Sequence, residues 1–208
     1  MELQAVTGQL YIINGAVQDP KTVPGLLAQS VPSRAARGRD QDFLFVHLTL
    51  SGQEEETSAL SNDLLDSISK IYYQTPGSVT AALRKAIIET NKELLGYNLR
   101  GETKTFEGAL TCAVQRGEEL YMAQTGEAFA FIGHNFGIER LPPSPPARIT
   151  PMGRTAGLDI RYFHNWLQSG DMLLMTDPRL DIVATNALQP ALIRLTHRRL
   201  ISPFLSRR

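Results

Sequence analysis

Two amphipathic helix patterns follow one another directly in residues 51–101, and strand patterns flank them on both sides. The first helix is expected to begin at Ser51, with Glu54 as its capping-box partner. The second is expected to begin at Thr75, with Pro76 in its first turn, and to end before Gly101. The apolar faces comprise Leu60, Leu64, Leu65, Ile68 and Tyr72 on the first helix, and Val79, Leu83, Ala86, Ile87, Thr90 and Leu94 on the second. Two consecutive helices between strands argue against repeated β-α-β units and favour an antiparallel sheet layered with helices.

The flanking strand patterns predict two such sheets. Residues 42–50, DFLFVHLTL, are largely apolar on both faces, which is typical of a central strand. Further strands are expected at 3–14, 106–115, 119–134, 137–141, 161–167 and 170–177, and short helices at 179–185 and 187–199. Residues 15–40 and 141–153 carry many prolines and are expected to be long loops, the first with short strand pieces. The expected fold is an α+β, αββα sandwich of two mainly antiparallel sheets flanked by helices.

The charge balance excludes some classes of partner. Lys+Arg and Asp+Glu both total 21, so the formal net charge is zero. We expect no nucleic-acid partner, because such proteins usually carry a basic excess. Arg34, Arg37 and Arg39 form one basic cluster and residues 194–208 carry another, and both are expected on solvated surfaces.

The single cysteine, Cys112, lies in an apolar strand and is expected to be a core residue in a reducing compartment. The sequence contains no stretch of about 18 apolar residues, so no membrane span is predicted. The N-terminus has neither the basic start nor the apolar run of a signal peptide, so a cytoplasmic location is expected. The four histidines share no metal-ligand spacing, and no P-loop or dinucleotide-binding glycine motif occurs.

Asp177 ends an apolar strand and precedes Pro178, and two interpretations are open. Asp177 is either a metal ligand or the N-cap of a helix in which proline takes the first position. Asp181 is correspondingly a ligand or an acidic residue that complements the helix dipole. Glu127 follows Gly126 and is a ligand or an exposed strand residue.

Three stretches, in order, resemble the metal-dependent protein serine/threonine phosphatases of the type 2C-like (PPM) family. They are DFLFVHLTLSG at 42–52, EGALTCAVQRGEELYMAQTGEAFAF at 107–131 and GDMLLMTDPRLDIV at 170–183. The resemblance implies an αββα sandwich. It also implies two Mn²⁺ or Mg²⁺ ions held by carboxylates, with a bridging water as the nucleophile.

The chain departs from the family at the ligands. The family's central aspartate, in an Asp-Gly-x-Gly-Gly turn, corresponds to Leu48 or, with a one-residue slip, to Thr49. The family's early Asn-Glu-Asp has only a poor counterpart at residues 40–42, and its closing Asp-Asn strand is missing before Arg208. The resemblance leaves Asp177, Asp181 and Glu127 as remaining metal-site candidates.

The expected function is therefore that of a pseudophosphatase, a catalytically degenerate PPM-like domain that binds a protein partner in bacterial signalling. It spans residues 1–208, is truncated at the C-terminus relative to the family, and needs no cofactor. The alternative is a divergent active phosphatase that uses Mn²⁺ or Mg²⁺ on Asp177, Asp181, Glu127 and Asp42. A third class with this architecture, the amidohydrolases with an N-terminal nucleophile, is disfavoured because the chain starts Met1-Glu2.

Overall fold

The computed structural model describes residues 3–13, 16–18, 23–52, 54–101, 104–135 and 137–182. The helix expected at 187–199 lies outside these residues. After the last strand, the described residues include one helical segment, the 3-10 helix η1 (Pro178–Ile182).

A five-stranded antiparallel sheet forms the middle of the molecule. The prediction of a central strand at 42–50 is confirmed, because this strand has a neighbour on each side. Its register pairs Asp42 with Arg116 at one end and Leu50 with Gly108 at the other. In order across the sheet, the strands are β3 (Leu26–Ser30), β4 (Asp42–Leu50), β5 (Gly108–Arg116), β6 (Glu119–Thr125) and β9 (Arg161–Trp166).

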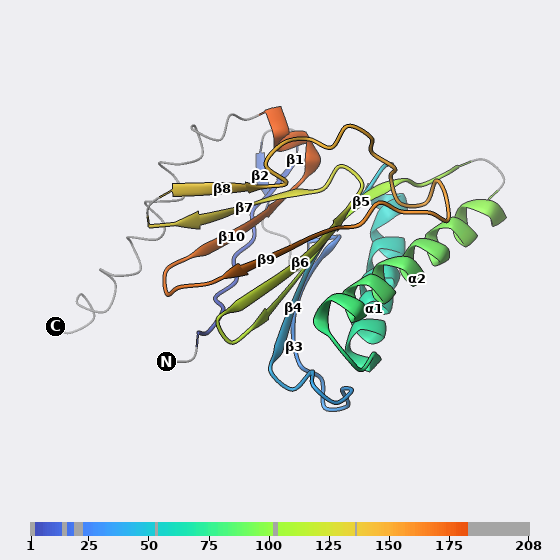
Figure 1. The fold of residues 1–208 in the computed structure, drawn as a ribbon. Helices are drawn as coiled ribbons and strands as arrows, with labels where there is room; N and C mark the ends of the chain where they lie inside the picture. Colours follow the sequence, from blue (N-terminus) through green and yellow to red (C-terminus); the bar gives the residue numbers. More distant parts are fainter. Residues whose placement is uncertain are drawn as a thin grey trace.

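Helices α1 (Glu54–Gln74) and α2 (Val79–Arg100) cover one face of this sheet (Figure 1). Leu44, Val46 and Leu48 point from β4 into the helix layer, as strand alternation requires. Their helical neighbours include Leu64, Ile68, Leu83 and Ile87, the faces predicted from the sequence. Each such side chain contributes about 1.5–3 kcal/mol by its burial.

A second, three-stranded sheet packs on the other face of the five-stranded sheet. It consists of β10 (Met172–Thr176), β7 (Phe129–His134) and β8 (Gly137–Leu141), all antiparallel. The layer between the sheets is apolar and contains Ala113, Leu120 and Met122 from one sheet and Ala130, Ile132 and Leu141 from the other. The predicted sandwich of two antiparallel sheets with helices is confirmed.

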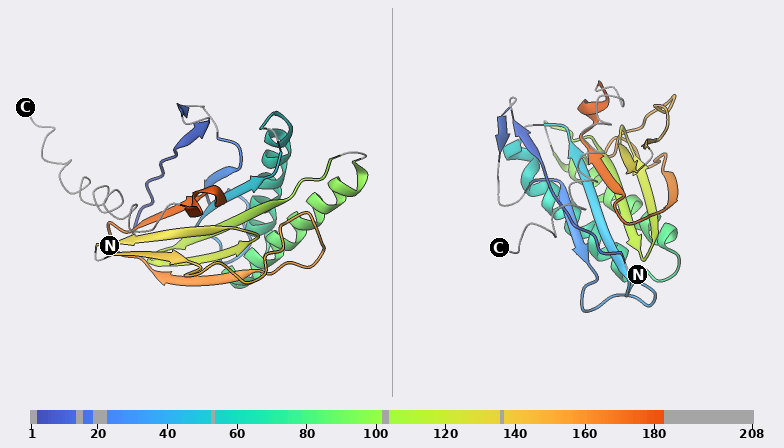
Figure 2. Two further views of the ribbon diagram at one scale, coloured as in Figure 1. Left: turned by 90° about the horizontal axis from the view of Figure 1, so that it is seen from above. Right: turned by 90° about the vertical axis from the view of Figure 1, so that its left-hand side faces the viewer.

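The N-terminal strand is shorter than predicted. Residues 3–10 form no regular structure, and among the described residues β1 (Tyr11–Ile13) pairs only with β2 (Ala16–Gln18), in a hairpin at the margin of the molecule (Figure 2). Val6 and Thr7 are the β-branched residues of this segment, and no described strand lies beside them to form a ladder.

Both predicted helix starts are wrong. The Ser51 hydroxyl accepts a hydrogen bond from the Glu107 N–H at 3.0 Å, so it ties β4 to the start of β5, and α1 begins at Glu54. The Thr75 hydroxyl donates to the Ile71 carbonyl within the last turn of α1. The N-cap of α2 is Ser78, whose side chain accepts from the Ala81 N–H at 3.2 Å.

The prediction that Arg39 lies on a solvated surface is also wrong, because its side chain is fully buried. Its guanidinium donates to the carbonyls of Thr75, Gly77 and Ser78 at 3.2, 3.0 and 2.8 Å and to Asp42 at 3.4 Å. Arg39 therefore joins the α1–α2 connection to the start of β4. Three backbone carbonyls and a carboxylate compensate the desolvation of the buried cation.

Cys112 is fully buried, and burial raises its pKa well above the ordinary value, so its role as a core residue is confirmed. In the described ranges, no helix has the length and apolarity to cross a membrane. The proline-rich segment 141–153 forms an irregular connection with one bridge, between Met152 and Gly108, as predicted.

Candidate functional site

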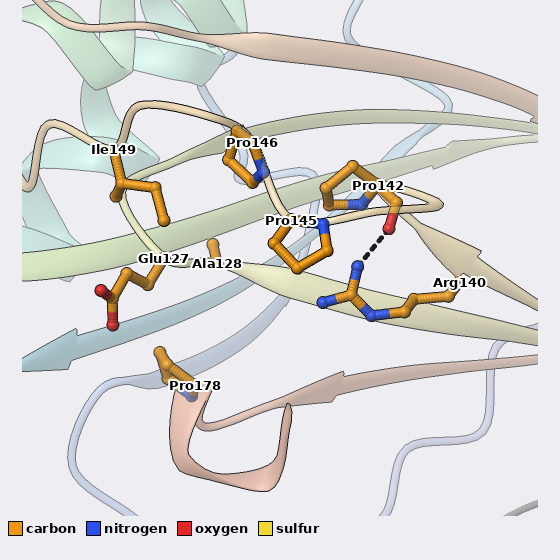
Figure 3. Close-up of a pocket in the computed structure, with 8 residues that line it drawn as sticks. All are labelled: Glu127, Ala128, Arg140, Pro142, Pro145, Pro146, Ile149 and Pro178. Atoms are coloured by element: carbon orange, nitrogen blue, oxygen red, sulfur yellow. Dashed lines mark hydrogen bonds between the residues drawn. The ribbon is translucent and has the colours of Figure 1, made fainter. Parts of the chain in front are cut away.

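The candidate site is a small cavity between the β6–β7 turn, the proline-rich loop and η1 (Figure 3). Its volume is about 180 Å³. Glu127 and Pro178 lie at one end and Arg140 and Pro142 at the other, as Figure 3 shows. The lining residues are Glu127, Ala128, Arg140, Pro142, Pro145, Pro146, Ile149 and Pro178.

Glu127 is exposed and stands in the turn between β6 and β7, not inside a strand. Gly126 before it has φ +70°, and a Cβ there would lie 2.6 Å from the Gly108 carbonyl oxygen, so only glycine fits. One guanidinium nitrogen of Arg161 donates to the carbonyls of Gly126 and Ala128 at 2.7 and 3.3 Å. Arg161 on β9 therefore fixes the backbone on both sides of Glu127.

Arg140 forms the opposite wall of the cavity. Its guanidinium donates to the Pro142 carbonyl (Figure 3). It also lies over the Phe129 ring, 4.9 Å from the centroid. The cation–π contact and the hydrogen bond hold the positive charge of Arg140 in place. The cavity thus carries an acidic and a basic group at its two ends, with proline rings between them.

Asp177 is the N-cap of η1. Its Oδ1 accepts from the Arg179 N–H at 2.9 Å, and its backbone carbonyl accepts from the Leu180 N–H at 3.0 Å. The Arg179 guanidinium also bonds both carboxylate oxygens, at 2.8 and 2.7 Å. These hydrogen bonds from Arg179 lower the pKa of Asp177. The N-cap interpretation is therefore confirmed by the geometry, and whether Asp177 also binds a metal stays a prediction.

Asp181 lies within η1, four residues after Asp177, and only its backbone is described. Its predicted role as an accessory metal ligand therefore stays a prediction.

His47 lies in the layer between the sheets, within electrostatic range of Asp177. Burial lowers its pKa below the ordinary value, and the negative charge of Asp177 opposes that shift. The register places His47, Thr111, Gln124 and Arg161 side by side across β4, β5, β6 and β9. No role was predicted from the sequence for these four residues. The feature that could have identified this row from the sequence is a polar residue in each of four strands, at positions that the strand register places side by side.

The two positions that correspond to the family's central aspartate face opposite ways. Leu48 points into the helix layer and is 3% exposed. Thr49 alternates with it and shares the face of Phe45, which packs in the layer between the sheets. Its hydroxyl donates to the Ala109 carbonyl at 3.4 Å. Neither residue presents a carboxylate at this edge.

Asp42, included in the alternative active site, lies at the far end of β4. It is seven residue steps from Thr49 along the strand, or roughly 23 Å at about 3.3 Å per step. Its carboxylate binds Arg116 at 2.6 and 2.9 Å, Tyr72 at 2.6 Å and Arg39 at 3.4 Å. Asp42 is therefore removed from the alternative ligand set.

Within the described part of the chain, no cluster of three or more His, Cys, Asp or Glu side chains has the geometry to hold a metal ion. A hard divalent cation requires several oxygen ligands, mostly carboxylate. Among the described side chains, the edge occupied by Thr49, Glu127 and Asp177 offers two carboxylates, one of which already binds Arg179. The described donor set does not fit a paired-metal site.

The comparisons define the fold: the chain has the fold of the PP2C-type (PPM) serine/threonine phosphatases. No protein-family model and no curated protein matches it. A bacterial serine phosphatase superposes with a TM-score of 0.61 at 16% identity, over 85% of this chain and 88% of that one. Stp1 from Staphylococcus aureus gives 0.59 at 16% identity, over 91% and 92%. The PP2C domain of SpoIIE from Bacillus subtilis gives 0.53 at 15% identity, over 85% and 52%.

Proposed function

We propose that this chain is a pseudophosphatase, a phosphatase-like domain that has lost the paired-metal chemistry and acts by binding in a signalling system. The single observation that carries the proposal is the orientation of Leu48 and Thr49. Leu48 packs in the helix layer, and the Thr49 hydroxyl donates to the Ala109 carbonyl. These two positions correspond to the bridging carboxylate of the family. Without that carboxylate, two cations at this edge have no shared anionic ligand.

The Asp177–Arg179 pair supports the same proposal. A guanidinium that bonds both oxygens of a carboxylate neutralises it in a fixed bidentate geometry. Arg179 thus supplies at Asp177 the positive charge that a metal ion supplies in the family. The Arg179 side chain is 90% exposed, so a divalent ion competes at Asp177 with a surface ion pair worth about 0–1 kcal/mol.

A protein partner fits this role. One solved neighbour is PppA, described as a key regulatory component of a secretion system in Pseudomonas aeruginosa, with a TM-score of 0.54 at 14% identity. Another, SpoIIE, is described as a cell fate determinant. By analogy we assign this chain a regulatory role in the bacterial cytoplasm, as one phosphatase-like domain over residues 1–208, with a protein as its partner and no nucleic acid.

The test is a phosphatase assay on p-nitrophenyl phosphate and on a phosphoserine peptide, with and without Mn²⁺. We expect no metal-dependent turnover. Turnover that requires Mn²⁺ and is abolished by Asp177→Asn would refute the proposal. Glu139→Gln removes an exposed carboxylate from β8 and serves as the matched control, because it should change nothing in either case.

The alternative is a divergent active phosphatase with Mn²⁺ or Mg²⁺ on Asp177, Asp181 and Glu127. It is favoured by one observation: Glu127 and Pro178, the neighbour of Asp177, line the same cavity. A crystal soaked in Mn²⁺ tests it directly. Anomalous density shared by Asp177 and Glu127 would support the alternative, and density absent at saturating Mn²⁺ would remove it.

A further inference from the structure

Strand β9 is an edge strand with a free side. Among the described residues it pairs only with β6. The register continues past the strand end, where the Leu167 N–H donates to the Glu118 carbonyl at 2.7 Å. In an antiparallel ladder, hydrogen-bonded and non-bonded pairs alternate, so Arg161, Phe163 and Asn165 bond toward β6. The N–H and C=O groups of Tyr162, His164 and Trp166 therefore point to the free side.

The same three residues also carry exposed side chains on the helix-facing side of the sheet. Tyr162 is 40% and Trp166 64% exposed, and the His164 side chain is 44% exposed. The His164 ring lies 4.7 Å from the Tyr121 ring and 5.9 Å from that of Trp166, so the three rings form a continuous aromatic stripe.

Nothing in β9 protects this edge. Soluble proteins usually block an edge strand with lysine, proline, a bulge or an added cover. Residues 161–166, RYFHNW, contain no lysine, proline or glycine, and their register with β6 has no bulge. The one charged residue of the strand, Arg161, turns inward to the Gly126 and Ala128 carbonyls.

We propose that β9 is a self-association surface on which a second copy of this chain pairs antiparallel, with the two-fold axis at His164. This register sets Tyr162 of each copy opposite Trp166 of the other, and His164 opposite itself. Every free N–H and C=O of the three residues then faces a complementary group. The contact is isologous and closed, and it joins two five-stranded sheets into one. Aromatic pairs directly across strands contribute about 0.2–1 kcal/mol each.

The charges at the two ends of the stripe favour this orientation. Glu119 lies directly opposite Trp166 on β6, and its carboxylate bonds the Tyr121 hydroxyl and lies 3.5 Å from His164 Nε2, so the half of the stripe between Trp166 and His164 is acidic. Arg84 of α2 lies near the Tyr162 end: burial raises the pKa of the Tyr162 phenol, and the positive charge of Arg84 opposes the shift. Antiparallel pairing about His164 sets the acidic end of one copy against the basic end of the other, on both sides of the axis.

Sedimentation analysis of the full chain is the first test. We expect a monomer–dimer equilibrium that Trp166→Lys shifts at least tenfold toward monomer. Leu99→Lys is the matched control, because Leu99 is a 78% exposed apolar residue on α2, away from β9. A monomeric wild-type chain, or a dimer that responds equally to both substitutions, would overturn the proposal. Far-UV circular dichroism confirms that each variant is folded.

Disulfide trapping tests the register. Opposed residues in a hydrogen-bonded antiparallel pair have Cα atoms about 5.5 Å apart, which suits a disulfide. Mild oxidation should crosslink His164→Cys to itself, and should crosslink Tyr162→Cys only when mixed with Trp166→Cys. Cys112 is fully buried, so the wild-type chain provides an uncrosslinked control. Failure of His164→Cys to crosslink in a dimeric sample would overturn the proposed two-fold axis at His164. This outcome is independent of metal binding and phosphatase activity.

Discussion

At the residue scale, Asp42 is the most strongly bonded carboxylate that the structure describes. It accepts hydrogen bonds from Arg116 at 2.6 and 2.9 Å and from Tyr72 at 2.6 Å, and it faces the fully buried Arg39. Removing one partner of a buried ion pair leaves the other charge without compensation, which costs about 3–5 kcal/mol. We expect Asp42→Ala to lower the free energy of unfolding by that amount, as measured by urea denaturation.

The control for this prediction is Asp159→Ala. The Asp159 side chain is 62% exposed and lies 3.9 Å from Arg161, so its pair belongs to the weak surface class worth about 0–1 kcal/mol. If Asp42→Ala cost no more than Asp159→Ala, the network around Arg39 would not hold the start of β4 to the helix layer.

His47 gives the protein a pH-dependent stability. Burial lowers its pKa in the folded state from 6.5, against the opposing charge of Asp177. Below about pH 6.5 the unfolded chain binds a proton at His47 more readily than the folded chain does, so stability falls with falling pH. We expect the wild type to lose urea resistance between about pH 7.5 and about pH 5.5. His47→Gln should lose less over the same range, and equal slopes for the two proteins would contradict this role.

At the element scale, the β6–β7 turn is fixed by a close approach between backbones. A Cβ on Gly126 would meet the Gly108 carbonyl oxygen at 2.6 Å, whereas one on Gly117, in the β5–β6 turn, would meet nothing within 4 Å. Both glycines have positive φ, +70° and +59°. Gly117→Ala should therefore cost about 1–2 kcal/mol from the left-handed conformation alone. Gly126→Ala should cost clearly more, measured as the difference between their urea midpoints; equal costs would argue against the close approach.

Local patterns predict the elements well where the deciding contacts are local. The strand at 42–50 and the buried face of α2 follow from alternation and helical spacing. The helix starts do not, because the Ser51 hydroxyl bonds Glu107, a residue far along the chain. Likewise, Arg39 lies in a polar stretch, yet the carbonyls that bury it come from the α1–α2 connection. Sequence spacing carries no signal for such non-local partners.

The site residues follow the same rule. Asp177 before Pro178 is a local cap signal, and the structure confirms it. Arg161 and Arg140 have no comparable local signal. Arg161 on β9 donates to the Gly126 carbonyl in the β6–β7 turn, which is distant in sequence. Arg140 is held by its contacts with the Phe129 ring and the Pro142 carbonyl. The cavity is assembled by three segments that only the packing of the two sheets brings together.

At the scale of the whole molecule, the packing that stabilises the fold does not depend on the residues that would bind a metal ion. The helix layer and the apolar layer between the sheets are complete without any ion, since Leu48 fills space in the helix core and Thr49 bonds the neighbouring strand. Apolar packing in these two layers, with about 0.8 kcal/mol from each buried CH₂ group, and the buried Arg39–Asp42 network together stabilise this architecture. On the proposed function, a domain without the metal ligands therefore keeps a stable scaffold.

This independence predicts the thermal response to metal. A ligand that binds only the folded state at 100 times its Kd raises the free energy of unfolding by about 2.7 kcal/mol. A protein of about 200 residues would then gain roughly 5–10 °C in Tm.

Because Arg179 already bonds both oxygens of Asp177, we expect Mn²⁺ or Mg²⁺, and equally EDTA, to leave the Tm unchanged. Arg179→Gln frees the Asp177 carboxylate and should still show little shift, since the two carboxylates among the described side chains at this edge are too few ligands. A rise in Tm with Mn²⁺ that Asp177→Asn removes would instead identify a working metal site.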